Sequence, residues 1–312
     1  MTRTTTPFGA QSTASEVIAG VDLTGRRAVV TGATGGLGRE TARALASAGA
    51  EVTVAGRTLK TATDVAQEIA AGTGNPLTRA GQLDLADPAS VAAFVAGWSG
   101  PLHILVNNAG IMATPELRTP AGRELQFATN HLGHFAVTVG LHGALAAAGD
   151  ARVVVLSSVG HVNGPVRFDD PDFTVEPYDP WLAYAQSKTA NVLFAVEAAK
   201  RWAADGITVN ALNPGRIWGT GLGRHMDAPP ASFDPSGTSG VSEKNIAQGA
   251  ATSTLLAASP LLDGVTGRYF EDCQEAAPHT PGVRRGVAAH AVDPDSARKL
   301  WDLSIRLTVR DQ

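Results

Sequence analysis

The chain has 312 residues, of which 44% are hydrophobic and 17% charged, and its formal net charge is −4. This length accommodates one large α/β domain or two small ones, with enough apolar residues for a substantial core. The slight negative charge argues against nucleic acid as a partner, and one cysteine, Cys273, excludes an internal disulfide and fits a reducing compartment.

The N-terminal segment, residues 1–24, is interpreted as a polar leader. It is rich in threonine between Met1 and Gln11 and lacks the apolar stretch of a signal peptide. Nowhere does the chain contain an apolar run long enough to cross a bilayer, so we expect no transmembrane helix and no membrane partner. These features predict a cytoplasmic protein.

Strands and helices alternate along residues 25–312, which we interpret as one domain. The predicted strands are 27–31, 51–55, 78–83, 103–106, 152–156, 207–212 and 267–270. The predicted helices include 59–71, 120–147 with some breaks, 180–203, 242–258 and 294–307. Apolar strands separated by helices are typical of a parallel sheet covered on both faces. The sequence therefore predicts an α/β, Rossmann-type doubly wound sheet of about seven strands.

A glycine-rich turn, Thr31–Gly38, joins the first strand to the first helix. Its glycines let the backbone turn tightly and approach a ligand, and the helix that follows offers free amides and partial positive charge to a pyrophosphate. The spacing is G-x-x-x-G-x-G and differs from the general G-x-G-x-x-G fingerprint. The turn predicts nucleotide binding, with a merely tight connection as the alternative.

The residue after the second strand bears on the choice of nucleotide. An acidic residue there would bind the 2′-hydroxyl of NAD, but the chain has Gly56 and Arg57. A guanidinium suits a 2′-phosphate, and Arg39 is a candidate second cation. The sequence therefore predicts NADP(H) over NAD(H), which stays the alternative; either arginine could instead be a solvated surface charge.

Tyr184 and Lys188 lie four residues apart in the predicted helix 180–203, and therefore on one face of it. A neighbouring cation favours the phenolate and is expected to lower the pKa of Tyr184 from its reference value of about 10. Tyr184 is thus a candidate proton donor or acceptor. The alternative is a surface pair, because this spacing is common on amphipathic helices.

Together these motifs resemble the short-chain dehydrogenase/reductase family, and the match covers nearly the whole chain. The TGxxxGxG turn, the NNAG sequence at 107–110 and the Pro-Gly pair at 214–215 appear in the family's order. Asn130, Ser158, Tyr184 and Lys188 match its catalytic tetrad. Segments 130–135, 183–188, 190–194 and 300–304 resemble the retinol-dehydrogenase and WW-domain-oxidoreductase-like branch.

The resemblance implies a role for each of these residues. Tyr184 is the general acid or base, and Lys188 lowers its pKa and binds the nicotinamide ribose. Ser158 hydrogen-bonds the substrate oxygen, and Asn130 holds a water that links Lys188 to solvent. The residues that the resemblance and the motifs assign to cofactor binding are Gly32, Thr34, Gly36, Leu37, Gly38, Arg57, Asp84, Leu85, Asn108, Ala109, Gly110, Tyr184, Lys188, Pro214, Gly215 and Ile217.

The irregular segment 215–240 follows the sixth strand, at the end of a parallel sheet where ligands bind. We interpret it as a substrate loop in which Trp218, Leu222 and Met226 form an apolar wall; a plain surface loop is the alternative. We expect no metal, because His131 and His134 have no acidic or cysteine partner nearby. His161 is interpreted as an ordinary loop residue.

The sequence thus predicts an NADP(H)-dependent oxidoreductase acting on the carbonyl or alcohol of a small, rather apolar substrate. One alternative is a regulatory module that binds NADP without turnover, although such proteins usually lose the Tyr or the Lys. A sugar-nucleotide epimerase would have its glycines spaced G-x-x-G-x-x-G. Family resemblance also implies a homo-oligomer packed through 120–147 and 180–203, although the branch contains monomers.

Overall fold

The computed structural model describes residues 3–217, 219–224 and 240–309. Its main sheet has eight strands in the order β10-β9-β6-β5-β4-β1-β2-β3. All neighbours pair in parallel except β9 and β10. The strands are β1 (Arg27–Thr31), β2 (Glu51–Gly56), β3 (Arg79–Gln82), β4 (Ile104–Asn107), β5 (Arg152–Leu156), β6 (Thr208–Asn213), β9 (Tyr269–Glu271) and β10 (Gln274–Glu275). The predicted doubly wound sheet is confirmed.

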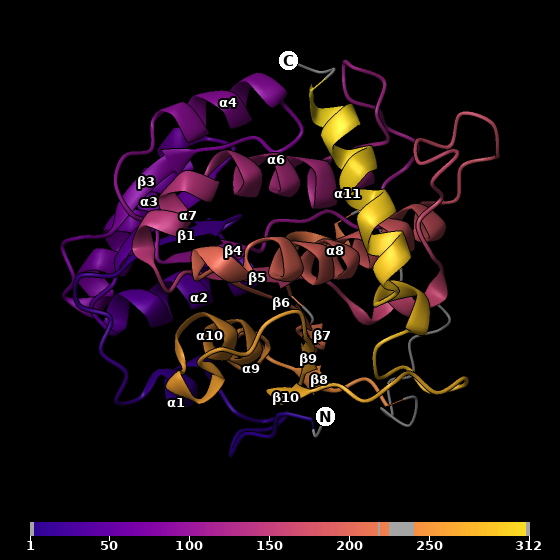
Figure 1. Cartoon of the computed structure of the whole chain (residues 1–312). Helices are drawn as coiled ribbons and strands as arrows, with labels where there is room; N and C mark the ends of the chain where they lie inside the picture. Colours follow the sequence, from indigo (N-terminus) through magenta and orange to yellow (C-terminus); the bar gives the residue numbers. More distant parts are fainter. Residues whose placement is uncertain (1–2, 218, 225–239, 310–312) are drawn as a thin grey trace.

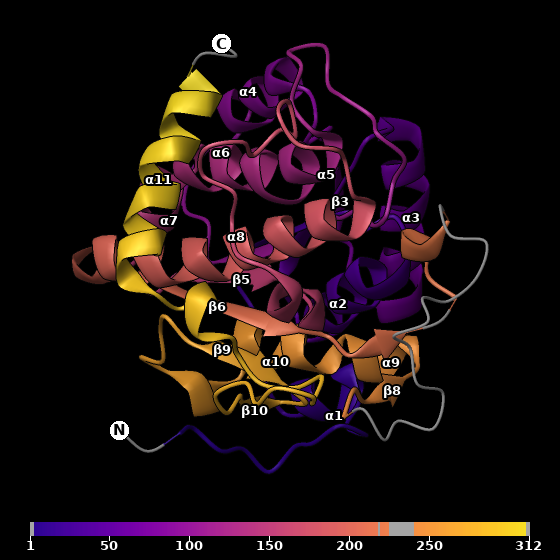
Figure 2. The ribbon, with the colours of Figure 1, turned by 90° about the vertical axis from the view of Figure 1, so that its right-hand side faces the viewer.

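Helices cover both faces of the sheet (Figure 1). One layer contains α1 (Ala14–Ile18), α2 (Gly36–Ser47), α3 (Leu59–Thr73), α9 (Ile246–Gly249) and α10 (Ala251–Ala258). The other contains α4 (Pro88–Ala96), α6 (Gly133–Gly140), α7 (His142–Ala148) and α8 (Pro180–Arg201). A last helix, α11 (Pro294–Val309), packs against α8, and Figure 2 shows it in yellow beside that helix.

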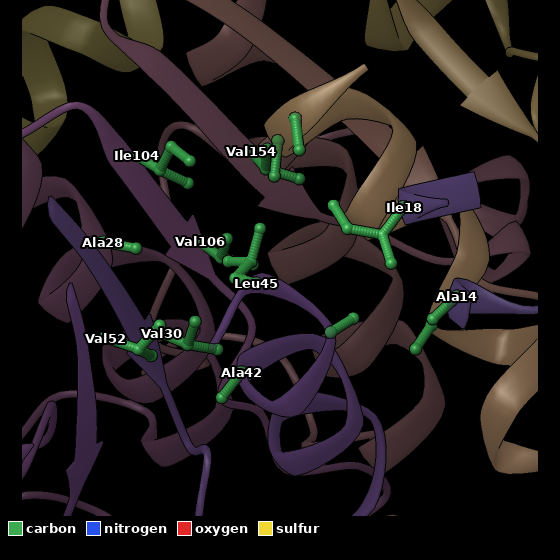
Figure 3. Close-up of a cluster of buried hydrophobic side chains, with 14 of the residues drawn as sticks. Ala14, Ile18, Ala28, Val30, Ala42, Leu45, Val52, Ile104, Val106 and Val154 are labelled. Atoms are coloured by element: carbon green, nitrogen blue, oxygen red, sulfur yellow. The ribbon is translucent and has the colours of Figure 1, made fainter. Parts of the chain in front are cut away.

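The side chains of a strand alternate between the two faces of the sheet, so β1 contributes residues to the hydrophobic cores on both sides. Ala28 and Val30 of β1 point toward α2, whereas Val29 points toward α8. Figure 3 shows the first of these cores, in which strand residues meet Ala42 and Leu45 of α2. Because strands buried on both sides read as continuous apolar runs, the sequence pattern located them well.

Two predicted helices differ from the structure. The prediction 120–147 fails at its start, because the helical region begins at α5 (Leu125–Phe127), where the Glu124 carboxylate accepts the backbone N–H groups of residues 126 and 127. It continues through a π-helical turn, Ala128–Leu132, into α6 and α7. The prediction 242–258 divides into strand β8 (Glu243–Lys244), α9 and α10, with Asn245 capping α9.

The sequence analysis predicted β9, as strand 267–270, but missed β10 and the hairpin turn that joins the two strands. The strands of this hairpin are very short, and its turn places Asp272 and Cys273 at φ values of 52° and 59°. Neither residue type predicts a left-handed conformation as strongly as glycine does. Cys273 is a free, buried thiol packed in the core, in agreement with a structural role.

The N-terminal segment is joined to this hairpin and to the core. The backbone N–H groups of Thr4 and Thr6 donate to the side chains of Glu275 and Gln274. Helix α1 buries Ala14, Val17 and Ile18 against the first core (Figure 3). The described part of the predicted leader, residues 3–24, therefore packs onto the same sheet as the rest of the domain.

The predicted substrate loop, 215–240, is described only at its two ends. At one end, β7 (Arg216–Ile217) pairs in parallel with β8, and a short 3-10 turn follows at Gly221–Gly223. Trp218 and Met226, both predicted to line the pocket, lie outside the described residues. In the described part of the chain, no helix combines the length and the apolar character needed to span a bilayer.

Candidate active site

A cavity of about 740 Å³ opens at the carboxyl ends of the parallel strands. Every residue predicted to hold the cofactor lines this cavity, and so does Ser158. This is the place where open parallel sheets bind ligands, and the volume lies in the range of ligand pockets. Of the four residues of the predicted catalytic tetrad, Asn130 alone does not line the cavity.

The part of the cavity lined by the glycine turn is called the nucleotide end here, and two glycines form its floor. A Cβ atom on Gly38 would lie 2.4 Å from Asn108 Nδ2 and 2.6 Å from the carbonyl oxygen of Gly32. A Cβ atom on Gly32, whose φ is +62°, would lie 2.8 Å from the Cα atom of Ala109. Only glycine therefore lets the ends of β1 and β4 approach so closely.

The same end leaves backbone donors free for a phosphate. Gly35 precedes α2 and has no side chain to cap the first backbone N–H groups of the helix. The first turn of α2, residues 36–38, lines the cavity, so these N–H groups can serve a ligand there. Asn108 anchors the neighbouring strand end by donating to the carbonyl of Thr31 over 2.7 Å. This cradle fits a pyrophosphate, as the glycine motif predicted.

The two candidate cations of the nucleotide end have different surroundings. Arg57 follows β2 and lines the cavity beside Gly56. Arg39, proposed as a second cation, instead pairs with Glu68 of α3 and does not line the cavity. The sequence could not foresee this partner, because Glu68 belongs to the next helix. Of these two arginines, therefore, Arg57 alone lines the cavity.

Tyr184 and Lys188 lie side by side on α8 and are both buried. Lys188 Nζ lies 5.7 Å from the Tyr184 ring centroid and donates to the carbonyl of Leu156 over 3.1 Å. Burial raises the pKa of Tyr184 to about 12, an effect opposed by a hydrogen bond with Ser158. The expected lowering of the Tyr184 pKa is thus wrong for this structure, because burial of the phenol raises the pKa. Burial also lowers the pKa of Lys188 to about 8.

Ser158 begins the 3-10 turn Val159–Asn163, just beyond β5. Its hydroxyl accepts the Gly160 N–H at 3.0 Å. A Cβ atom on Gly160 would lie 2.9 Å from Tyr184 Cε1, so this glycine lets the tyrosine ring pack against the serine turn. The sequence analysis did not single out Gly160, because its requirement comes from a helix that follows much later in the chain.

Asn130 lies in the π-helical turn and is fully buried. Its Oδ1 accepts the Ile111 N–H at 2.9 Å, and its Nδ2 donates to the Ile111 carbonyl and to Ser187 Oγ. A Cβ atom on Gly110 would lie 3.3 Å from Asn130 Oδ1 and 3.6 Å from Lys188 Nζ. Asn130 therefore borders the lysine, but most of its hydrogen-bonding capacity serves to hold residue 111.

His161, interpreted from the sequence as an ordinary loop residue, is buried behind Ser158. The Ala288 N–H donates to its Nε2 at 3.1 Å, so Nδ1 carries the proton, which it donates to the Ser158 carbonyl over 2.7 Å. The Tyr269 hydroxyl lies 3.3 Å from the same Nδ1. Burial lowers the pKa of His161 to about 4, which keeps the ring neutral. The ring joins the serine turn to the segment after β10.

The other end of the cavity is mainly apolar. Its walls include Met112, Leu117, Leu125, Val159, Leu222 and Val241. Leu222 thus lines the pocket as predicted. Among the residues that the structure describes, no cluster of three or more histidine, cysteine, aspartate or glutamate side chains is arranged to hold a metal.

The chain is similar to known dehydrogenases and oxidoreductases. A family model described as short chain dehydrogenase matches residues 26–229. A probable oxidoreductase of Streptomyces antibioticus is 57% identical over 294 residues, which cover 90% of this chain and 97% of the relative. Human retinol dehydrogenase 13 is 38% identical over 292 residues, with coverages of 91% and 85%. A solved gluconate 5-dehydrogenase of Burkholderia cenocepacia, in complex with NADP and tartrate, has a TM-score of 0.64 and 27% identity, with coverages of 80% and 94%.

Proposed function

The chain belongs to the short-chain dehydrogenase family, in its retinol-dehydrogenase-like branch, and we propose that it is an NADP(H)-dependent oxidoreductase acting on a small carbonyl compound or the corresponding alcohol. One observation supports this most directly. Ser158, Tyr184 and Lys188 line the same cavity as the glycine cradle, so a dinucleotide held by the cradle would extend toward the tyrosine. The bound nicotinamide would supply or accept a hydride.

In the direction of reduction, Tyr184 donates a proton to the carbonyl oxygen as the hydride reaches the carbonyl carbon. A tyrosine whose pKa is about 12 is protonated at neutral pH, so it is ready to donate. The Ser158 hydroxyl hydrogen-bonds the same oxygen and stabilises the charge that develops on it. In oxidation these roles reverse, and Tyr184 removes the alcohol proton.

Lys188 and Asn130 act behind the tyrosine. With a pKa of about 8, Lys188 exchanges protons readily near neutral pH and can return one to Tyr184. Its ammonium faces Gly110 together with Asn130 Oδ1, which retains one lone pair for a water molecule. We therefore keep the relay role of Asn130 as part of the proposal, together with its role in holding residue 111.

The preference for NADP(H) over NAD(H) rests on Arg57. Its guanidinium lines the cavity at the end of β2, where the adenosine ribose would lie, and no carboxylate follows that strand before residue 64. Asp84, the only carboxylate among the described lining residues, comes after β3. This arrangement favours a phosphorylated ribose over a free 2′-hydroxyl.

The proposal is tested by Tyr184→Phe. We expect turnover of carbonyl substrates to fall by about 10²- to 10⁴-fold, while NADPH binding, followed by the fluorescence of the reduced nicotinamide, stays within about twofold. Retained activity would remove Tyr184 from the mechanism. Wild-type protein that binds NADPH but oxidises none across a broad ketone and aldehyde panel would favour the regulatory-module alternative.

The expected homo-oligomer through α6, α7 and α8 needs a qualification. Helix α11 packs along α8 (Figures 1 and 2). Its Trp301 stacks with Phe194 and meets Phe135 edge-on. An oligomer that uses this face would have to displace α11 or include it. We propose a cytoplasmic setting, which the single free cysteine supports.

A further inference from the structure

Besides Arg57, three of the described arginines line the cavity, and they are Arg216, Arg224 and Arg284. Arg284 lies on the segment after β10 and lines the same cavity as Ser158 and Tyr184. Its Nη1 is 3.5 Å from Asn163 Oδ1, at the last residue of the 3-10 turn that Ser158 begins. A 3-10 helix rises about 2 Å per residue, so Asn163, next to this guanidinium, lies on the order of 10 Å along the turn from Ser158.

The carboxylates near Arg284 are already paired with other cations. Its neighbour Arg285 pairs with Glu271 and with Asp272, at 3.3 and 2.5 Å. Asp272 also pairs with the buried Lys244 at 2.8 Å. No described carboxylate lies within ion-pairing distance of Arg284 itself, whose recorded polar contact is the amide of Asn163.

The electrostatic surroundings of Arg284 favour a negative ligand. Its pKa is lowered by burial and, to a smaller extent, by the positive charge of Arg216. Arg216 and Arg224 line the cavity as well, whereas Asp84 belongs to the nucleotide end. A half-buried guanidinium that faces like charge is costly unless an anion joins it.

We propose that Arg284 binds a carboxylate at the far end of the substrate. The preferred substrates would then be oxo acids in which an apolar segment separates the reacting carbonyl from the carboxylate. The apolar walls between Tyr184 and Arg284, such as Val159 and Val241, would contact that segment. This inference rests on the proposed oxidoreductase function and adds to it the chemical class of the substrate.

The test compares azelaic semialdehyde with its primary amide, which has the same chain and aldehyde but no charge. Wild-type protein should prefer the acid in kcat/KM by about 10- to 100-fold, because hydrogen bonds to charged groups are the strong ones. Arg284→Gln should abolish this preference and leave kcat/KM for the amide within about twofold. Arg284→Glu should invert the preference, and added salt should weaken it in the wild type.

Arg298→Gln is the matched control, because Arg298 is an exposed arginine on α11 that pairs with Asp295 outside the cavity. It should keep the wild-type preference. Equal kcat/KM for acid and amide in the wild type would overturn the proposal. So would an Arg284→Gln variant that raises the KM for NADPH and affects both aldehydes equally, because Arg284 would then serve the cofactor.

A binding measurement separates this inference from the proposed function. Calorimetry with nonanoate and nonanamide, in the presence of saturating NADP, needs no turnover. We expect nonanoate to bind about tenfold or more tightly than the amide to wild-type protein, and equally to Arg284→Gln. If no aldehyde is reduced but nonanoate binds in this way, the oxidoreductase proposal fails and the anion site stands. Equal binding of both ligands to the wild type rejects the anion site.

Discussion

The two ends of the cavity are built in different ways. The nucleotide end comes mainly from one continuous piece of chain, β1, the glycine turn and α2, with short additions after β2, β3 and β4. The substrate end combines the 3-10 turn after β5, the middle of α8 and segments on both sides of residues 225–239. A contiguous piece needs only local rules, whereas a composite one depends on buried polar contacts between distant segments.

Three buried histidines should make the fold sensitive to acid. Burial lowers the pKa values of His131, His134 and His161 to about 3, 4 and 4, so the unfolded chain binds their protons first as the pH falls below 6.5. Glu124 opposes this, because burial raises its pKa to about 7 and the folded state holds that proton. The net difference is about two protons, or roughly 3 kcal/mol of unfolding free energy lost per pH unit between about pH 6.5 and 5.

Urea unfolding at several pH values measures this slope. Glu124→Gln removes the opposing carboxyl, so its stability should fall more steeply with acid than that of the wild type, by about one further proton. A stability that is flat between pH 6.5 and 5 would show that the three buried rings are not held neutral in the folded state.

The His161 ring joins the Ser158 turn to Ala288, so a substitution at His161 should affect catalysis without affecting cofactor binding. His161→Phe leaves the Ala288 N–H without its acceptor and removes a donor from the Ser158 carbonyl. We expect a loss of about 3 kcal/mol of stability, and a kcat lowered by about 10- to 100-fold through misplacement of the serine, with NADPH affinity unchanged.

The control for this change is His290→Phe. The His290 ring contacts the His161 carbonyl and does not reach the serine, so kcat should stay close to the wild-type value. Thermal unfolding, single-turnover kinetics and NADPH fluorescence give the three readouts. If His161→Phe weakens NADPH binding as much as it lowers kcat, the two ends are coupled and the comparison fails.

A side chain added to Gly38, at the nucleotide end of the cavity, should destabilise the fold through steric overlap. Gly38→Ala places a methyl group 2.4 Å from Asn108 Nδ2 and 2.6 Å from the Gly32 carbonyl oxygen, so the start of α2 must move away from the ends of β1 and β4. We expect about 2 kcal/mol of destabilisation from overpacking, together with weakened NADPH binding. Gly143→Ala is the matched helix substitution, because a Cβ atom there meets no neighbour, and it should be neutral or slightly stabilising. Equal behaviour of the two variants would contradict the role of the cradle.

The smallest effect concerns cofactor choice. Arg57→Ala should raise the KM for NADPH about tenfold and leave that for NADH nearly unchanged, because only the 2′-phosphate needs the guanidinium. Arg39→Ala is the control, since Arg39 pairs with Glu68 outside the cavity. Steady-state kinetics with both cofactors measure the ratio. An unchanged ratio for Arg57→Ala would transfer the cofactor preference to other residues.

Sequence patterns located the strands and the glycine turn but were less reliable for helix boundaries. The start of the helical region at Leu125 depends on a buried carboxylate, Glu124, which also contacts Tyr178. Likewise, the sequence placed Tyr184 and Lys188 on one helix face but gave the wrong direction for the Tyr184 pKa. Charge alone can be read from residue spacing, whereas desolvation depends on what surrounds the helix.

The doubly wound sheet, the glycine cradle and the family motifs could be predicted from the amino-acid sequence, because they follow from short-range periodicity and from residues that occur in a fixed order. Three features became visible only in the folded chain: Gly160 makes room for Tyr184, His161 holds the Ser158 turn, and Arg284 lines the cavity while Arg285 is paired with carboxylates. Each depends on segments that are distant in the chain and adjacent only after folding. Neighbouring arginines look alike in a sequence, and burial and partners give them different roles.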